Sequence, residues 1–368
     1  MLYALQPFLK YFALLGLVPW SESCAHFQFM QKVYSCFLIV FNFGTFGISL
    51  YFPQPSELFI SLMVNVIVFV AKTACVTVIV LQMIIKYDDY YRFCKEMKCL
   101  GLRLQCELNI DLGGLSWQSY VKVFGLGIGF LVAIIPSVYV ALSGSLIYFW
   151  SSLLSILIIR MQCILMLLYV DLLGHHVCLL GKRIKNVIDC HMMGAKCIPD
   201  GNGHQLCSLE FLLALKQSHM ELYHLFSHFN DLFGWSILSI YVVLFSDSTV
   251  NIYWTQQVLA EVYEHIYLYA TFSVFIPSFI IIFVFCRCGE FCKRQNVLIG
   301  SYLRILSCHF SATTVPAYND LLSEFIMQVE QNLLVINAEG FVDTDNSLLM
   351  SVLAAKVTYL IVLMQFSS

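Results

Sequence analysis

The sequence predicts an all-α integral membrane protein with seven transmembrane helices, a cytoplasmic N-terminus and an extracellular C-terminus. Three observations support this: the composition, the long apolar segments and the position of the positive charges. Of the 368 residues, 60% are hydrophobic and only 12% are charged, and the mean hydropathy is +0.79. Soluble domains are about 45–50% apolar and about 25% charged. Lipid must therefore cover much of the apolar surface of this chain.

Seven segments are long and apolar enough to cross the ~30 Å hydrocarbon core, which takes about 20 residues. They are residues 33–52, 58–85, 121–142, 146–172, 233–252, 266–285 and 347–366. The longest connections, about 173–232 and 286–346, contain polar, partly amphipathic sequence that favours helices. Residues 1–368 are thus expected to form a single seven-helix membrane domain.

The positive charges predict the orientation. Seventeen of the 20 Lys and Arg lie before the first span or in the connections after the second, fourth and sixth spans, and the other side of the membrane has none. The positive-inside rule places that charged side in the cytoplasm. The 15 cysteines agree, because none lies in a predicted external connection, where disulfides would form.

Lys72, Arg160 and Lys356 lie within predicted spans. Ionisable residues inside a membrane are candidates for function. Lys72 and Arg160, however, lie toward the inner third of their spans, where a long side chain extends to the cytoplasmic headgroups. Snorkelling or a structural ion pair is therefore the simpler interpretation for these two, and a functional role stays open.

Asp247 lies in the outer half of the fifth predicted span, and we expect no nearby Lys or Arg to neutralise it. It shares a helix face with Ser236, Asn251 and Trp254, which favours a polar, water-accessible cavity. The alternative is a carboxylate that accepts hydrogen bonds from neighbouring serines or helices. Other polar or aromatic side chains lie in the outer halves of their spans. The resulting candidates for a ligand pocket are Asn65, Tyr139, Tyr148, Ser152, Asp247, Asn251, Tyr267 and Thr271. Such a lining suits a small organic compound, although aromatic residues at helix ends also form interfacial belts.

The last predicted helix carries a stripe of mostly small or polar side chains at spacings of three and four. These are Ser347, Ser351, Ala354, Thr358, Ile361 and Gln365. Periodicity leaves two interpretations open: tight helix packing, which favours small residues, or the water-lining face of a pore.

The end of the chain, residues 358–366, reads TYLIVLMQF and resembles the C-terminal signature of insect gustatory receptors. The preceding AEGF at 338–341 and the Asp345-x-x-Leu348-Leu349 pattern are also similar to that family. The resemblance implies a ligand-gated, non-selective cation channel that acts as a taste receptor in the plasma membrane of sensory neurons. Its partners would be a small-molecule tastant, permeant cations, membrane lipid and identical or related subunits of a tetramer.

In such a tetramer the seventh helices, residues 347–366, would line the pore, and the segments 173–232 and 286–346 would contribute a cytoplasmic anchor. The resemblance assigns the pore lining to Ser351, Ala354, Thr358, Ile361, Gln365 and Phe366, with the last two at the extracellular constriction. Lys356 would face away from the pore axis, because it lies about 180° from Gln365 on the helix. The chain is short for the sugar-sensing branch, which favours bitter or other aversive compounds.

Other classes fit less well. The sequence has no motif of an enzyme, no basic stripe for nucleic acid and nothing that implies a cofactor. Cys286, Cys288, Cys292 and Cys308 match no common zinc spacing, so we expect no metal site. A G-protein-coupled chemoreceptor, the alternative with seven spans, would have its N-terminus outside, the reverse of the charge distribution. A secondary transporter would show internal repeats, and none is visible.

Overall fold

The structure, a computed structural model, describes residues 10–19, 25–51, 59–110, 147–192, 208–260, 266–310 and 316–367, together with 125, 127–129, 132, 135 and 138. Its helices are α2 (Ala25–Tyr51), α3 (Phe59–Ile85), α4 (Tyr87–Cys106), α7 (Ile147–Met192), α8 (Leu209–Leu259), α9 (Ile266–Phe310), α10 (Pro316–Gln331) and α11 (Asn346–Ser367). A small antiparallel hairpin, β1 (Asn337–Ala338) and β2 (Val342–Asp343), connects α10 to α11.

Every predicted span except the third coincides with one of these helices. In the third, 121–142, residues 125, 127–129, 132, 135 and 138 are helical, and the rest lie outside the described residues. Four described segments are long and apolar enough to cross a membrane. They are Met63–Ile85, Leu153–Asp189, Leu209–Leu259 and Thr271–Cys308, and Asn346–Val362 is a shorter apolar helix. The all-helical class is confirmed for the described part, whereas the count of seven crossings and the orientation stay predictions.

Three helices are much longer than a membrane is thick. α7, α8 and α9 run for 46, 51 and 45 residues without interruption, which is about 68–77 Å at 1.5 Å per residue. The predicted spans therefore continue directly into the connections, which contain no proline in 173–192, 209–232 or 286–310 to end a helix. More than half of each helix extends beyond a ~30 Å hydrocarbon core.

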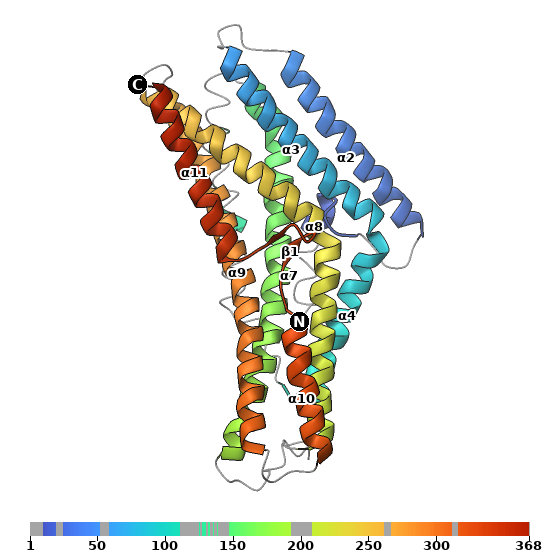
Figure 1. Ribbon diagram of the computed structural model, residues 1–368. Coiled ribbons are helices and arrows are strands. Elements are labelled where there is room, and N and C mark those ends of the chain that lie inside the picture. Colours follow the sequence, from blue (N-terminus) through green and yellow to red (C-terminus); the bar gives the residue numbers. More distant parts are fainter. Residues whose placement is uncertain are drawn as a thin grey trace.

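The two ends of the molecule differ (Figure 1). At one end α4, α10, the end of α7 and the start of α8 lie together, and the C-terminus of the chain lies at the other end, beside the end of α8. The described Lys and Arg of the long connections lie on or beside α4, in the end of α7, in the start of α8 and in the last part of α9. We call this group, α4 and α10 with the adjoining ends of α7, α8 and α9, the base.

Aromatic packing holds α4, α7 and α8 together. Tyr90, Phe93, Tyr169, Phe229 and Phe233 are at most 2% exposed, and their ring centroids lie 5.0–6.3 Å apart. The hydroxyls of Tyr90 and Tyr169 hydrogen-bond to each other, so neither polar tip is buried alone. Edge-to-face and offset aromatic pairs contribute about 0.5–1.5 kcal/mol each beyond the area that they bury.

A buried polar group joins α8, α9 and α10 in the base. His219 is fully buried, and its Nε2 lies 2.9 Å from Asn296 Oδ1 while its Nδ1 lies 3.2 Å from Gln328 Nε2. The amides fix the tautomer: Nε2–H donates to Asn296, and Nδ1 accepts from Gln328. Because Nδ1 accepts a hydrogen bond it carries no proton, and burial lowers the pKa of the ring, so the imidazole is neutral. With both ring nitrogens satisfied, its role is structural.

Candidate functional site

The segment before α11 is fixed to α8. Asn230 on α8 donates through Nδ2 to the carbonyl of Val335 (2.9 Å) and accepts the backbone N–H of Asn337 (3.1 Å). Glu339 lies in the turn between β1 and β2 with a positive φ of 52°. Its side chain packs on Gly234 of α8, where a Cβ would lie 2.8 Å from Glu339 Oε1. The AEGF pattern therefore corresponds to a tight turn that lies against α8.

The first turn of α11 is fixed to α9. Asp345 accepts the backbone N–H groups of Ser347 (2.9 Å) and Leu348 (3.2 Å) through Oδ1, and Lys293 on α9 donates to its Oδ2 at 2.9 Å. Asp345 thus caps the N-terminus of α11, where a carboxylate also complements the helix dipole. At Gly289 on α9 an added Cβ would lie 1.8 Å from the carbonyl oxygen of Thr344. Only glycine permits this approach.

The predicted stripe on α11 faces away from the rest of the subunit. Its six members, Ser347, Ser351, Ala354, Thr358, Ile361 and Gln365, are all exposed. The Ser351 and Thr358 hydroxyls donate to the carbonyls of Ser347 and Ala354 within the helix, both at 3.0 Å. The side chain of Phe366 lies outside the described residues.

The opposite face of α11 packs on the subunit at the end near Asp345. Leu349 is 9% exposed and Lys356 is 7% exposed. Lys356 extends over the ring of Phe275 on α9, with its Nζ 5.8 Å from the ring centroid. Leu360, which the helical wheel places on this side, is 39% exposed. The wheel therefore predicts the packed face correctly at Lys356 but not one turn later.

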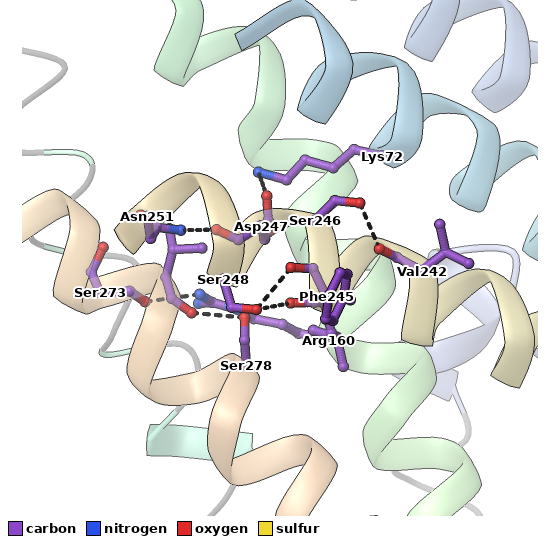
Figure 2. A network of polar contacts seen from close by, with 12 residues as sticks. Lys72, Arg160, Val242, Phe245, Ser246, Asp247, Ser248, Asn251, Ser273 and Ser278 are labelled. Carbon is purple, nitrogen blue, oxygen red and sulfur yellow. Dashed lines mark hydrogen bonds and ion pairs between the residues drawn. The ribbon is translucent and has the colours of Figure 1, made fainter. Parts of the chain in front are cut away.

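Asp247 is neutralised by a lysine from another helix (Figure 2). Lys72 Nζ on α3 lies 2.9 Å from Asp247 Oδ1 on α8, and both side chains are less than 10% exposed. The expectation that no cation lies near Asp247 was wrong, because it considered only neighbours along the chain. The proposed bonds from nearby serines are also absent among the described contacts: the hydroxyls of Ser246 and Ser248 donate to backbone carbonyls one turn earlier.

Arg160 satisfies a carbonyl that a proline leaves without its helical partner. Pro277 lies inside α9 and has no N–H to donate to the carbonyl of Ser273, four residues earlier. Arg160 Nη2 on α7 donates to that carbonyl at 3.0 Å (Figure 2). Helix-interrupting prolines are tolerated in membranes where a neighbouring helix supplies the missing bond. Arg160 is 6% exposed, so it is a structural partner of α9 and not a snorkelling side chain.

The remaining candidates for the pocket are only partly described. Asn251 donates to the carbonyl of Asp247 (2.6 Å), and Thr271, which is buried, donates to the carbonyl of Leu268 (2.9 Å). Asn65 on α3 is half-buried. Tyr139 lies outside the described residues, as do the side chains of Tyr148, Ser152 and Tyr267. Membership of the eight residues in one pocket therefore stays a prediction.

The comparisons with known proteins identify the family. The family described as 7tm Chemosensory receptor matches residues 5–368. The chain belongs to this family. Among its relatives, the Drosophila melanogaster protein named "Putative gustatory receptor 39b" is 75% identical over 368 residues, covering 100% of both chains. Gustatory receptor 23a of the same species is 32% identical over 158 residues, 41% of this chain and 40% of that protein. The resemblance inferred from the C-terminal signature is confirmed.

The fold of this chemosensory receptor is also found in solved structures. The insect olfactory receptor OR5 from Machilis hrabei in complex with eugenol superposes with a TM-score of 0.64 at 16% identity, covering 99% of each chain. A second structure of OR5 gives a TM-score of 0.63 at 15% identity, with the same coverage. The architecture of the receptor is thus shared with proteins whose sequences have diverged widely.

The structure of the receptor also reveals a groove of about 550 Å³ between α4 and α8 in the base, with a charged lining. Two polar contacts cross it: the ion pair of Arg103 with Glu221, and the contact of His228 Nδ1 with Glu96 Oε2 at 3.0 Å. These contacts hold α4 on α8. Within the described part of the chain, no group of three or more His, Cys, Asp or Glu is placed to hold a metal ion.

Proposed function

We propose that this receptor is a subunit of a ligand-gated, non-selective cation channel and acts in taste. The observation that supports the proposal best is the orientation of α11. Its stripe of Ser, Ala, Thr and Gln is exposed on a single subunit, while its one charged residue, Lys356, is turned inward. A polar face of this kind in hydrocarbon needs water or another protein against it.

Both interpretations of the stripe are satisfied in a symmetric assembly around α11. Helices from four subunits would bring Ser351, Ala354 and Thr358 to one axis, with Gln365 and Phe366 at the extracellular constriction. Four neutral amides at Gln365 replace part of a cation's hydration shell without holding the ion tightly, which suits weakly selective conduction. Within one subunit the stripe is not used for helix packing, because α11 packs on the subunit through Leu349 and Lys356 on its opposite face. The stripe is therefore left for contact with other subunits or with water.

Apolar side chains in the base support assembly with identical or related subunits. On α9 the exposed residues include Phe291, Val297 and Ile305, at 43–63% exposure, and on or just after α10 they include Met327 and Leu333, at 53–54%. These residues lie in the segment 286–346, which by the predicted orientation is cytoplasmic and not covered by lipid. Several large apolar side chains exposed to water on neighbouring elements are typical of a protein interface. We assign this surface to the anchor between subunits of a tetramer.

The ligand in this proposal is a small organic tastant, for which bitter or other aversive compounds are our first choice. A chemosensory receptor with the same fold, OR5, was solved with the small molecule eugenol. The place that we propose for the ligand is the outer half of the bundle, near Asn65, Asn251 and Thr271. By the predicted orientation, this place lies on the extracellular side of the ion pair between Asp247 and Lys72.

The receptor would lie in the plasma membrane of sensory neurons with its N-terminus in the cytoplasm.

The test of the proposed function is expression in frog oocytes, alone and with related gustatory receptors, followed by voltage-clamp recording against caffeine, denatonium, quinine and sucrose. An agonist-evoked current that reverses near 0 mV with sodium and potassium supports the channel. Agonist responses that vanish when G-protein signalling is inhibited, together with an N-terminal epitope tag that antibodies reach on intact cells, would favour the G-protein-coupled class.

A further inference from the structure

Lys356 is a buried cation on the back of the proposed pore helix. It is the one charged residue in the sequence of α11, and only 7% of it is exposed. Its Nζ has no hydrogen-bond partner in the part of the chain that the structure describes. Its neighbour is the ring of Phe275. The face of this ring attracts a cation through its quadrupole, but the ring carries no negative charge that would neutralise the ammonium group. A buried charge of this kind is costly, which makes it a candidate for function.

The geometry of α11 places this charge directly behind the proposed pore wall. Ala354 and Thr358 on the exposed stripe lie two residues before and two residues after Lys356, and two residues turn an α-helix by about 200°. The ammonium group is therefore separated from the stripe by the thickness of one helix, about 10 Å with side chains. The intervening material is protein and not water, so the field of the charge is weakly screened.

The buried acidic side chains do not cancel this charge. Among the described residues, the buried acids are Asp247 and Asp345. Asp247 is paired with Lys72, and Asp345 is paired with Lys293, each at 2.9 Å. Lys356 consequently contributes a net positive potential on the pore side of each subunit.

We propose that Lys356 lowers the permeability of the channel to divalent cations relative to monovalent ones, in a pore that otherwise selects only weakly among cations. The energy of an ion in a potential is proportional to its charge, so Ca²⁺ experiences twice the repulsion that Na⁺ does. One Lys356 per subunit surrounds the axis with equivalent positive charges. The pore then conducts monovalent cations and has a low permeability to calcium. The charge acts from behind the helix, so no lysine has to stand in the path of the ions. This inference rests on the proposed channel function.

The experiment compares neutral and charged substitutions. Lys356→Met removes the charge and keeps the length and apolar stem, Lys356→Gln is a second neutral variant, and Lys356→Arg is the matched control that retains the charge. The reversal potential of the current evoked by an active compound of the tastant panel is measured with external Ca²⁺ against internal Na⁺. This quantity does not depend on the number of channels or on their open probability. We expect the calcium-to-sodium permeability ratio to rise about five-fold or more in Lys356→Met and Lys356→Gln, and to change less than about two-fold in Lys356→Arg.

The outcomes separate the inference from the proposed function. An unchanged permeability ratio in both neutral variants, with normal wild-type currents, overturns the role of Lys356 and leaves the channel intact. An equal change in all three variants also overturns it, because packing and not charge would then be responsible. A wild-type receptor that signals without any ionic current of its own removes the proposed function and the inference together.

Discussion

Arg160 Nη2 donates a hydrogen bond to the carbonyl oxygen of Ser273 at 3.0 Å, the carbonyl for which Pro277 supplies no N–H. Replacing Arg160 by Met removes this hydrogen bond from a buried carbonyl, which costs roughly 1–3 kcal/mol. In a Pro277→Ala background the helix supplies its own N–H, so we expect the same Arg160→Met change to cost less. The measurement is the melting temperature of purified receptor in detergent for the wild type, Arg160→Met, Pro277→Ala and the double variant. Strictly additive losses would contradict the relationship.

The ion pair between Lys72 and Asp247 predicts strong coupling. Removing one partner leaves a charge buried without its counter-ion, so Lys72→Met and Asp247→Asn should each destabilise the fold by about 3–5 kcal/mol. The double variant removes both charges and should recover most of the loss. Asp89→Asn is the control, because its ion pair with Arg92 at 3.4 Å is exposed and contributes about 0–1 kcal/mol. The idea fails if the double variant is as unstable as the sum of the single ones.

Gly289 predicts a steric effect on the start of α11. A Cβ at this position would lie 1.8 Å from the carbonyl oxygen of Thr344, so Gly289→Ala must displace the first turn of α11 or the adjoining part of α9. We expect a loss of about 1–3 kcal/mol or more and a marked reduction of folded receptor in fluorescence-detected size-exclusion chromatography. Gly300→Ala on the same helix is the matched control, because its nearest contact, Val329 Cγ1, lies at an ordinary 3.6 Å. Equal tolerance of both changes would show that the approach of Thr344 is not constrained.

Asp345 predicts a pH-dependent contribution to stability. Burial alone would raise the pKa of Asp345, but the hydrogen bonds from Lys293 and from the backbone N–H groups of Leu348 and Ser347 outweigh it. The pKa therefore lies below the usual value of 3.8. A carboxyl group whose pKa is lowered by folding stabilises the folded state above its unfolded pKa, and this contribution is lost as the pH falls through the folded pKa.

Asp345→Asn keeps a capping oxygen but loses the charge, so it should cost roughly 0.5–1 kcal/mol at pH 6. The difference in melting temperature between the wild type and this variant should shrink as the pH is lowered below about 4. Asp89→Asn, which changes an exposed carboxylate on α4, serves as the control. A difference that grows on acidification would have the wrong sign.

The exposed face of α11 predicts a pattern of chemical accessibility. A cysteine at Thr358 or Gln365 should make agonist-evoked current sensitive to a charged methanethiosulfonate reagent. A cysteine at Leu349, which is 9% exposed against the subunit, should not. The wild-type receptor, with its 15 native cysteines, supplies the baseline. Modification at Leu349 with silent stripe positions would mean that α11 presents a different face to the ions.

The sequence alone predicts the helices and the face of α11 because both depend on local periodicity. Apolar runs locate helices, and the spacing of Ser351, Ala354 and Thr358 identifies one side of a helix irrespective of what packs on the other. The limits appear where a partner from a distant helix decides the outcome. Leu360 is 39% exposed, because the side of α11 that is covered depends on how α8 and α9 lie against it and not on α11 alone.

The buried charges show the same limit more clearly. Local sequence does not predict the pairing of Asp247 with Lys72, because the two residues lie on different helices, α8 and α3. The same holds for the bond from Arg160 on α7 to Ser273 on α9. One signal was available: Pro277 inside a predicted span removes the helical hydrogen bond to the carbonyl four residues earlier. A search for a buried donor on another span would have made Arg160 a candidate.

The length of α7 makes it a mechanical lever between the two ends of the molecule. A helix of 46 residues is about 69 Å long, so a tilt of about 5° around its midpoint moves each end by roughly 3 Å in opposite directions. Because α7 packs on α8 and α9, a small rearrangement at one end is delivered to the base as a displacement of atomic size. Because α10, β1 and the first turn of α11 are attached to α8 and α9, the same displacement reaches the root of the last helix.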